Sequence, residues 1–528
     1  MAYKDGDMAI KELGSRRHRD RDYADMARAE KKQRLERNFG FLSMLGFTTT
    51  MMCTWEAVLF CNTDSMIDGG PVTLVYGFIF CWIGALVTAC SLAEMASMAP
   101  TSSGQYHWVS MLAPKGQAVF LSWVTGWLDM IGWWACTASG VYFGATVTQG
   151  LLVLNYPSYV LERWQGTLLM FAGLVVCLLV NSIGARLLPK IEGLILILHI
   201  MGFFAVLIPL VYMAPHKSAS YVFGTFSNTS GWKNPGLTWL IGLMGTNLPF
   251  IAEEVINASI TVPWYMIGTI LINGLLGFAI VISYLFCIGD PEQALNSPTG
   301  YSFIEVFFDA TKSHAGASVM SAIPAALVIC AAFGFLASSS RLTWAFARDK
   351  GVPFSDFLSH VSHILTKLIT QVKSGSALPI RAIVFCAIIT GITCLINIAS
   401  SAAFNAMISL TTAGLFSSYE IAIFLMLIKK IKRDPIQYGP WSLRRWGIPM
   451  NIASISFLII AIFFSFFPEE LPVTAINMNW SIVVFAGELF IGLGWYLIHG
   501  RKQYNGPIIE SGIIPVDDRS TQSGSSKD

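Results

Sequence analysis

Charged side chains are scarce in this chain of 528 residues, because Asp, Glu, Lys and Arg together make up only 12% of it. Soluble globular domains contain about 25% of these residues. Hydrophobic residues, in contrast, account for 54% of the chain. The composition argues against an ordinary soluble protein and is typical of a membrane protein.

Several motifs are also absent. The dipeptide Gly-Lys does not occur, so the chain has no phosphate-binding loop of the G-x-x-x-x-G-K-[ST] type, and with no soluble domain an ATP-driven pump is excluded. No filter-like loop and no Arg-rich span indicates a channel. The polar N-terminus shows no early apolar segment of a cleavable signal. A secondary transporter is the leading class, and a membrane-embedded enzyme or scaffold the second.

Cysteine is absent from the long loops. All ten cysteines, from Cys53 to Cys394, lie within or at the ends of apolar runs. This placement argues against a disulfide framework or a zinc site and indicates cysteines used as small apolar residues. We expect no metal and no cofactor.

What the chain does contain is twelve apolar runs. A membrane-spanning helix needs about 20 predominantly apolar residues, and most of the runs meet that length. They cover residues 41–61, 71–98, 118–150, 166–183, 191–213, 236–251, 266–288, 318–340, 382–398, 403–428, 447–467 and 480–498. The pattern predicts an all-α polytopic membrane protein with twelve transmembrane helices.

The basic residues predict the orientation. With the N-terminus in the cytosol, all 34 Lys and Arg face the cytosol except Arg163, Lys217, Lys233 and Lys312, as the positive-inside rule requires. Both termini are then cytosolic, and we expect disordered tails at residues 1–38 and 500–528 around a transporter domain at 39–499. Asn228-Thr229-Ser230 is a glycosylation sequon in an outer loop.

Polar residues interrupt the first and the sixth run. The first contains four threonines and Glu56, and the sixth reads Gly245-Thr246-Asn247-Leu-Pro249. Polar groups are costly in a membrane and tend to mark a pathway, and broken helices are tolerated where freed backbone groups line a cavity. Paired interruptions at matching positions of two halves predict a substrate site at the midplane. The alternative is two packing defects without function.

Five ordered motifs resemble those of fungal amino acid/choline permeases, a family of the amino acid–polyamine–organocation superfamily that includes 4-aminobutyrate and choline permeases. They are Gly69-Gly70-Pro71, the stretch from Ser91 to Trp108, Gly126-Trp127, Ala252-Glu253-Glu254-Val255 with Pro263, and Ser340-Arg341-Leu-Thr-Trp344-Ala345-Phe346-Ala347-Arg348-Asp349. The resemblance runs from about Phe39 to Tyr504. It implies a leucine-transporter-like 5+5 inverted repeat, with spans 1–5 in 41–213, spans 6–10 in 236–428 and two peripheral spans in 447–498.

One departure from the family pattern affects the substrate. Many members carry an Asp and a His in span 6, where this chain has Thr246 and Phe250. The identity of the substrate therefore cannot be transferred. Asp129, near the middle of span 3, is a carboxylate that could compensate by stabilising an ammonium group or accepting a coupling proton.

The predicted substrate site is centred on the two interruptions. We expect the N–H groups of Cys53-Thr54-Trp55 to receive a substrate carboxylate, helped by the positive end of the following half-helix, with the backbone of Gly245-Thr246-Asn247 opposite. Glu56 is a candidate for substrate ammonium or proton binding, or a structural carboxylate. The indoles of Trp55 and Trp133 could stack on a cation, although either could also serve packing alone. His199 in span 5 is interpreted as a core histidine.

Further charged residues are expected at the inner ends of the spans. Glu94 is interpreted as structural, bonded to loop amides, with an inner-gate role as the alternative. Glu253 and Glu254 could form a gate or salt bridge with Arg341, or remain solvated.

The sequence thus predicts a secondary transporter for an amino acid or related amine, with the lipid bilayer as its surroundings and no nucleic acid partner. Proton coupling and the plasma membrane follow from the family resemblance, with a vacuolar or other internal membrane as the alternative. Other functions left open are transport of a choline-like quaternary ammonium, transport of a specialised amine or alkaloid, and a transport-inactive nutrient sensor. Substrate, direction and oligomeric state stay open.

Overall fold

The computed structural model describes residues 41–99, 104–184, 188–250, 261–360, 378–399, 403–475 and 477–508. Nearly all of the secondary structure in these ranges is helical. The elements of the first half are α2 (Phe41–Met52), α3 (Thr54–Ile67), β1 (Asp68–Gly69), α4 (Pro71–Met98), α5 (Gly104–Leu112), α6 (Ala118–Asn155), α7 (Arg163–Ser182), α8 (Leu188–Met213), α9 (Ala219–Gly224) and β2 (Ser227–Asn228). The remaining elements are α10 (Pro235–Gly242), α11 (Met244–Asn247), η1 (Leu248–Phe250), α12 (Thr261–Cys287), α13 (Pro291–Leu295), α14 (Ser302–Thr311), α15 (His314–Arg348), α16 (Ser355–Leu358), α18 (Ile380–Cys394), α19 (Ile396–Ala399), α20 (Ala403–Lys432), η2 (Arg444–Trp446), α21 (Gly447–Ser465), α22 (Ser481–Trp495), η3 (Tyr496–Gly500) and α23 (Arg501–Gln503).

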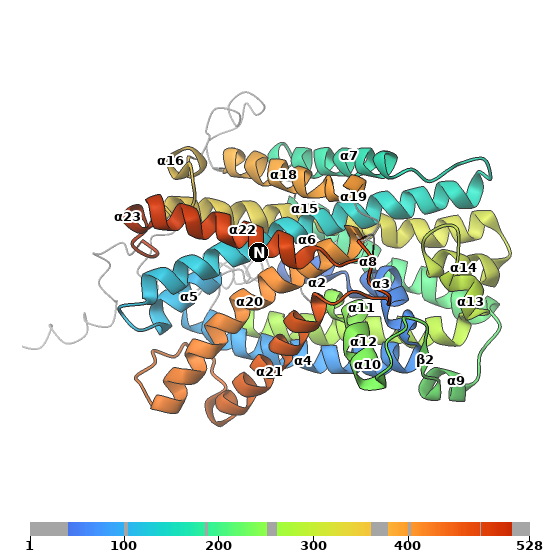
Figure 1. Ribbon diagram of the computed structural model, residues 1–528, viewed down its shortest axis with the longest axis horizontal. Helices are drawn as coiled ribbons and strands as arrows, with labels where there is room; N and C mark the ends of the chain where they lie inside the picture. Colours follow the sequence, from blue (N-terminus) through green and yellow to red (C-terminus); the bar gives the residue numbers. More distant parts are fainter. Residues whose placement is uncertain are drawn as a thin grey trace, which may run out of the picture.

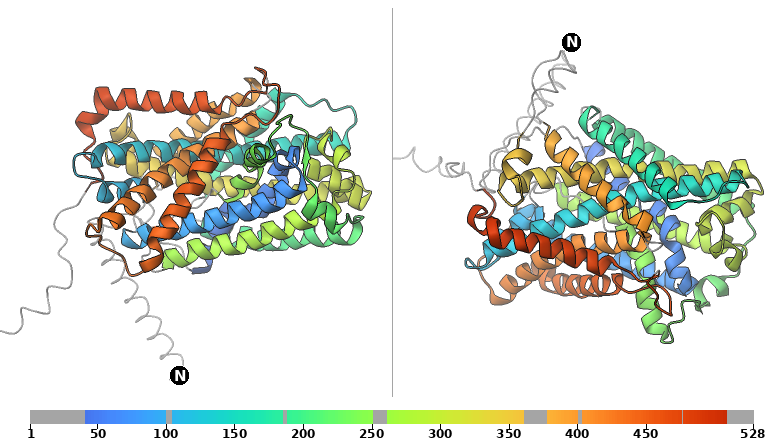
Figure 2. Two further views of the ribbon diagram at one scale, coloured as in Figure 1. Left: turned by 60° about the horizontal axis from the view of Figure 1, so that its bottom comes forward. Right: turned by 45° about the horizontal axis from the view of Figure 1, so that its top comes forward.

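The long helices run side by side along the longest dimension of the molecule (Figure 1), and two rotated views show the same arrangement (Figure 2). The 38-residue helix α6 packs against both α15 and α20. Glycines allow the closest of these approaches: a Cβ on Gly414 of α20 would lie 2.6 Å from the Cα of Gly132 in α6. On the other side of the bundle α4 packs against α12 and α21.

The short elements gather at the two ends of the bundle. In Figure 1, α5, α16 and α23 lie at one end, whereas α9, α13, α14 and β2 lie at the other. The first group belongs to connections that the charge pattern assigns to the cytosol, and the second group to connections assigned to the outside. The fold therefore separates the two sets of loops as the twelve-run pattern predicts.

Nine helices in the described part of the chain are long and apolar enough to cross a membrane. They comprise α4, α7, α8, α12, α15, α18 with α19, α20, α21 with η2, and α22 with its continuation to Gln503. The other predicted spans correspond to α6, to the pair α2 and α3, and to the series α10, α11 and η1. The last two are divided into pieces of 14 residues or fewer, because the helix is interrupted in each.

The packed part of the chain continues past residue 499, where the sequence predicts the start of the C-terminal tail. Tyr504 is fully buried, its hydroxyl lies 2.7 Å from Ser122 Oγ, and its ring packs edge-on against Phe346. The backbone N–H of Ile508 donates to Asp349 Oδ1 at 3.3 Å. The predicted N-terminal tail at 1–38 and the residues after Ile508 lie outside the described residues.

Candidate functional site at two interrupted helices

The first predicted span is interrupted at Cys53. This residue has φ 35° and ψ 47°, a left-handed conformation that ends α2 at Met52 and starts α3 at Thr54. Non-glycine residues adopt it rarely. The first helical bond of α3 runs from Ala57 N to Cys53 O (2.9 Å), so the N–H groups of Thr54, Trp55 and Glu56 precede the intrahelical pattern. The predicted interruption is confirmed, but it is one residue long instead of three.

The sixth predicted span is also interrupted, at a different residue from the one expected. α10 ends at Gly242, Leu243 separates it from α11, and η1 follows directly. Gly245-Thr246-Asn247, expected to be unwound, form most of α11. A Cβ on Gly245 would lie 2.4 Å from the carbonyl oxygen of Cys61. The glycine therefore allows α11 to pack closely on α3.

Hydrogen bonds join the neighbourhoods of the two interruptions. Thr54 Oγ1, in the first turn of α3, donates to the carbonyl oxygen of Pro249 in η1 at 2.9 Å. Asn273 of α12 donates through Nδ2 to the carbonyl oxygen of Thr49 at 3.3 Å. Thr49 is among the last four residues of α2, whose carbonyls lack helical partners. Side chains thus satisfy part of the backbone that the interruptions release.

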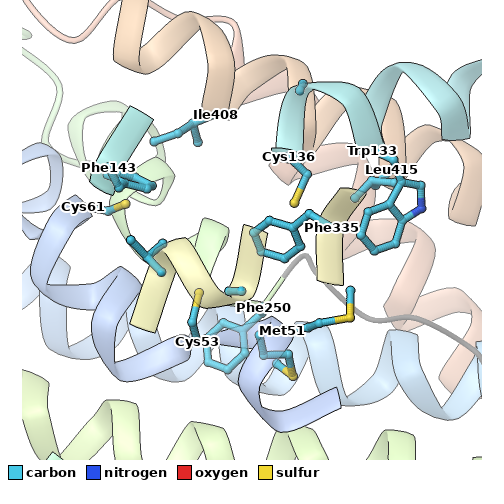
Figure 3. Close-up of a cluster of buried hydrophobic side chains, with 14 of the residues drawn as sticks. Met51, Cys53, Cys61, Trp133, Cys136, Phe143, Phe250, Phe335, Ile408 and Leu415 are labelled. Carbon is cyan, nitrogen blue, oxygen red and sulfur yellow. The ribbon is translucent and has the colours of Figure 1, made fainter. Parts of the chain in front are cut away.

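Figure 3 shows the side chains around Cys53, which are mostly apolar. Phe250 lies beside Cys53 in this view, and its ring is 5.1 Å from that of Phe78. Trp133 of α6 faces the same cluster, with its ring 6.4 Å from that of Phe335. Aromatic rings from four elements, η1, α4, α6 and α15, therefore converge beside the interruption of the first span.

Asp129 lies on the face of α6 that meets this cluster. It precedes Trp133 by four residues and Cys136 by seven, a spacing that places all three side chains on one helical face. All three are buried. At 1.5 Å per residue, Asp129 lies about 10 Å along α6 from Cys136, so it stands nearer the predicted cytosolic end than the interruption does.

Glu56 pairs with a residue of the fifth predicted span. Its Oε1 lies 2.7 Å from His199 Nδ1, and both side chains are almost completely excluded from solvent. One turn before the interruption, Thr50 Oγ1 donates to Glu192 Oε2 at 3.0 Å. The ring of Trp55 lies 6.0 Å from that of His199. Helix α8 therefore supplies two ionisable partners to the interrupted helix.

The sequence pattern does not predict this pairing, because it indicates only a core histidine at position 199. A usable signal was present, since Glu192 and His199 are seven residues apart in an otherwise apolar run. That spacing places both residues on one face of α8, where they indicate a polar partner helix.

The side chains of Thr246 and Asn247 make their contacts away from the apolar side chains around Cys53. Thr246 Oγ1 donates to the carbonyl of Leu243 (3.1 Å) and lies 3.4 Å from Cys81 Sγ in α4. Asn247 borders a cavity formed between α4, α10, α11, α20 and α21, together with Phe80, Thr412 and Phe457. These two polar side chains of the sixth span therefore face α4 and α21.

At the predicted cytosolic end, Glu94 links three segments. It forms a buried ion pair with Lys430 of α20 and accepts a hydrogen bond from the backbone N–H of Leu443 at 2.9 Å. A loop amide was the partner expected for a structural Glu94. Arg341 is half-buried at the inner part of α15, whereas its predicted partners Glu253 and Glu254 lie outside the described residues.

At the opposite end, Asn228 of the predicted sequon is exposed on β2. Its Oδ1 accepts hydrogen bonds from the backbone N–H (3.1 Å) and the hydroxyl (2.9 Å) of Ser230. The sequon thus forms a compact turn at the predicted outer surface.

The chain is similar to known proteins over most of its length. Residues 39–487 match the family model of the amino acid permeases. A protein of Macrophomina phaseolina described as an amino acid/polyamine transporter is 30% identical over 449 residues, which cover 83% of this chain and 96% of its own length. The choline transporter of Saccharomyces cerevisiae is 29% identical over 92% of this chain and 85% of its own length. Amino-acid permease BAT1 of Arabidopsis thaliana is 28% identical over 90% of this chain and 94% of its own length.

Proposed function

Because the chain belongs to the amino acid permease family, whose members are multi-pass membrane transporters and not enzymes, we propose that it carries an amino acid or related amine by alternating access. The substrate binds where the first and sixth spans are interrupted. The observation that carries this proposal is the left-handed Cys53 between α2 and α3, bridged to the sixth span by the Thr54–Pro249 hydrogen bond.

The full architecture proposed is twelve spans in a 5+5 inverted repeat with two peripheral helices. Adding α6 and the two interrupted spans to the nine long helices completes the twelve. The interruptions fall in the first span of each half, which is where this kind of repeat places its substrate site. Of the nine long helices, α22 is the least buried, as expected for a peripheral span.

In this site, the first turn of α3 receives the substrate carboxylate. The N–H groups of Thr54, Trp55 and Glu56 point out of the helix N-terminus, where the helix dipole also favours an anion. The Glu56 carboxylate pairs with His199 of α8, so one of its oxygens already has a hydrogen-bonding partner. Asp129, about 10 Å along α6 from Cys136, accepts the coupling proton, or it provides the negative charge for the ammonium group of a substrate long enough to reach it.

Proton coupling is proposed on two grounds. The pair Glu56–His199 joins two groups that exchange protons readily, in a position that links the interrupted helix to α8. The chain also has no nucleotide-binding motif to supply energy in another way. Both termini in the cytosol and residence in the plasma membrane complete the proposal, which leaves the direction of transport open.

A choline-like quaternary ammonium is the second candidate substrate. It is favoured by the rings of Trp133, Phe250 and Phe335 around Cys53, because aromatic faces attract such cations by about 0.5–2 kcal/mol. The relative described as a choline transporter points the same way.

The first experiment measures uptake of labelled amino acids, 4-aminobutyrate and choline into proteoliposomes with an imposed pH gradient. We expect one class of compound to accumulate. Asp129→Asn keeps the side-chain volume and removes the charge, so we expect uptake to fall at least tenfold, about 1.4 kcal/mol. Asp356→Asn, at a carboxylate whose side chain is 92% exposed on α16, is the matched control.

Each outcome has a defined meaning. Normal uptake by Asp129→Asn would remove Asp129 from the site and leave Glu56 as the principal carboxylate. Ligand binding without any uptake by the unmodified protein would instead support the nutrient-sensor alternative.

A further inference from the structure

Three carboxylates gather at the end of the molecule opposite to α5 and α16. Asp64 lies in the last turn of α3, Asp68 directly follows this helix in β1, and Glu469 comes from the connection between α21 and α22. The carboxyl groups of Asp64 and Glu469 lie within hydrogen-bonding reach of each other, and Glu469 also reaches the side chain of Asn405. We refer to Asp64, Asp68 and Glu469 as the outer carboxylate cluster.

Two of the three carboxylates are closed off from solvent, whereas Glu469 is half-buried. Asp68 is 0% exposed and Asp64 is 5% exposed. Strand β1 pairs with β2, with Asp68 opposite Asn228, and the end of α10 is so close that a Cβ on Gly242 would lie 2.9 Å from Asp68 Cβ. The outer halves of the first and sixth spans thus enclose Asp68 between them.

Asp68 is buried without a hydrogen-bond donor in the described part of the chain, since both of its carboxylate oxygens lack one. The hydroxyl of Ser230 interacts with Asp68 and partly lowers its pKa, but it donates its hydrogen bond to Asn228 Oδ1. One oxygen of Asp64 and one of Glu469 are buried in the same way. An ionised carboxylate in such a position costs several kcal/mol unless it is compensated.

Among the residues that the structure describes, the ionisable groups that act on the cluster offer no compensating cation. They are Glu470 beside Glu469, Cys61 one turn earlier on α3, and Tyr142 of α6, and none of these carries a positive charge. Arg163 acts on Tyr142 and not directly on the three carboxylates. Two carboxyl groups can share a hydrogen bond only when one of them holds a proton.

The energetics of titration agree with this geometry. Burial raises the pKa of Asp68 from the ordinary value of 3.8 to about 7, and burial also raises the pKa of Glu469. A carboxylate whose pKa is raised in the closed conformation favours closure when it is protonated. Closure is therefore favoured increasingly as the pH falls from about 7 toward 4, and opposed by the buried charge above about 7.

We propose that Asp64, Asp68 and Glu469 form an outer proton-binding site, which takes up protons from the external solution before the outer halves of spans 1 and 6 close over it. The inference rests on the proposed function as a proton-coupled transporter. A metal ion is the less suitable ligand, because the described residues contain no group of three side chains placed to hold one. The cluster lies about 15 Å along α3 from Thr54, so it is separate from the substrate site.

The test compares Asp68→Asn with the unmodified protein in two measurements. In proteoliposomes held at constant membrane potential, we expect uptake by the unmodified protein to rise at least fivefold as external pH falls from 8 to 5, and uptake by Asp68→Asn to change less than twofold. Glu469→Gln, whose amide can donate to Asp64 without a proton, should flatten the profile in the same way. Glu292→Gln, at an exposed carboxylate on α13, should keep the original profile.

The second measurement needs no substrate. The melting temperature of purified Asp68→Asn, relative to the unmodified protein, should be higher at pH 8, where the variant removes a buried charge, than at pH 5. A relative melting temperature that is the same at both pH values would overturn the inference, as would an unchanged pH profile of uptake. If no compound of the panel is transported, the proposed function fails, and the melting temperatures still decide whether the cluster binds protons.

Discussion

Contacts with residues that are distant in the sequence determine the roles of several buried polar side chains. Glu56 and His199 are 143 residues apart, yet their side chains form a 2.7 Å contact in a fully buried environment. A carboxylate at that depth requires a partner, since an unpaired buried charge is strongly unfavourable. The pair therefore both stabilises the packing of α3 on α8 and provides the candidate route for a proton.

Two substitutions of Glu56 separate these roles. Glu56→Ala leaves His199 without its partner, and we expect it to lower the free energy of unfolding by about 3–5 kcal/mol, the usual cost of removing one member of a buried pair. Glu56→Gln keeps a hydrogen bond to the imidazole but cannot exchange a proton. We expect it to retain most of the stability and to reduce gradient-driven uptake at least tenfold.

Thermal unfolding in detergent and uptake into proteoliposomes measure the two effects. Glu162→Gln, at an exposed carboxylate that precedes α7, should leave both unchanged. Full uptake by Glu56→Gln would show that the pair is only structural.

At the scale of helices, the sequence correctly predicted that the first and sixth spans are interrupted. It predicted less accurately at which residues the interruptions lie. Three consecutive threonines, Thr48 to Thr50, end three residues before Cys53 in a largely apolar run, and the break falls just after them. In the sixth span, Gly245 looked like a helix breaker. The structure shows that this glycine is needed for the close approach of α11 to α3, a tertiary demand that a single span does not reveal.

The contact at Gly245 gives a prediction for the pair of helices. In Gly245→Ala the new methyl group would overlap the carbonyl oxygen of Cys61, which is backbone and cannot move aside. Overpacking of this kind typically costs about 1–3 kcal/mol, so the melting temperature should fall and uptake should decrease. Gly268→Ala in α12, where a Cβ meets nothing within 4 Å, is the matched control and should be neutral or slightly stabilising.

The result can be read from the two alanine variants side by side. Equal melting temperatures for Gly245→Ala and Gly268→Ala would show that α11 is not held tightly against α3.

For the whole molecule, the distribution of charge along the sequence predicts the separation of loops between the two ends of the bundle. α5, α16 and α23 lie at one end and α9, α13 and β2 at the other (Figure 1). The topology can be predicted from the sequence because the bilayer determines where basic residues and long apolar runs occur, whatever the details of packing. The outer carboxylate cluster could not be predicted from the sequence, because only the tertiary fold brings Glu469 next to Asp64.

This arrangement predicts two cytosolic termini. Tags at the N- and C-termini should resist protease added outside sealed right-side-out vesicles and be cleaved after permeabilisation. Cleavage of either tag in sealed vesicles would invert the assignment.

The same arrangement predicts that Asn228, exposed on strand β2, accepts a glycan. Glycosidase treatment should then change the mobility of the protein but not that of Asn228→Gln.

The ten cysteines have a practical consequence. All of them are free thiols, eight are buried and Cys90 and Cys330 are half-buried, so none is fully open to a reagent in solution. A membrane-impermeant maleimide should therefore react little with the native chain. With Cys53 at the substrate site replaced by Ala, the chain can then serve as a background of low reactivity for single-cysteine labelling, in which one new thiol at a time reports when the path to the substrate opens to each side of the membrane.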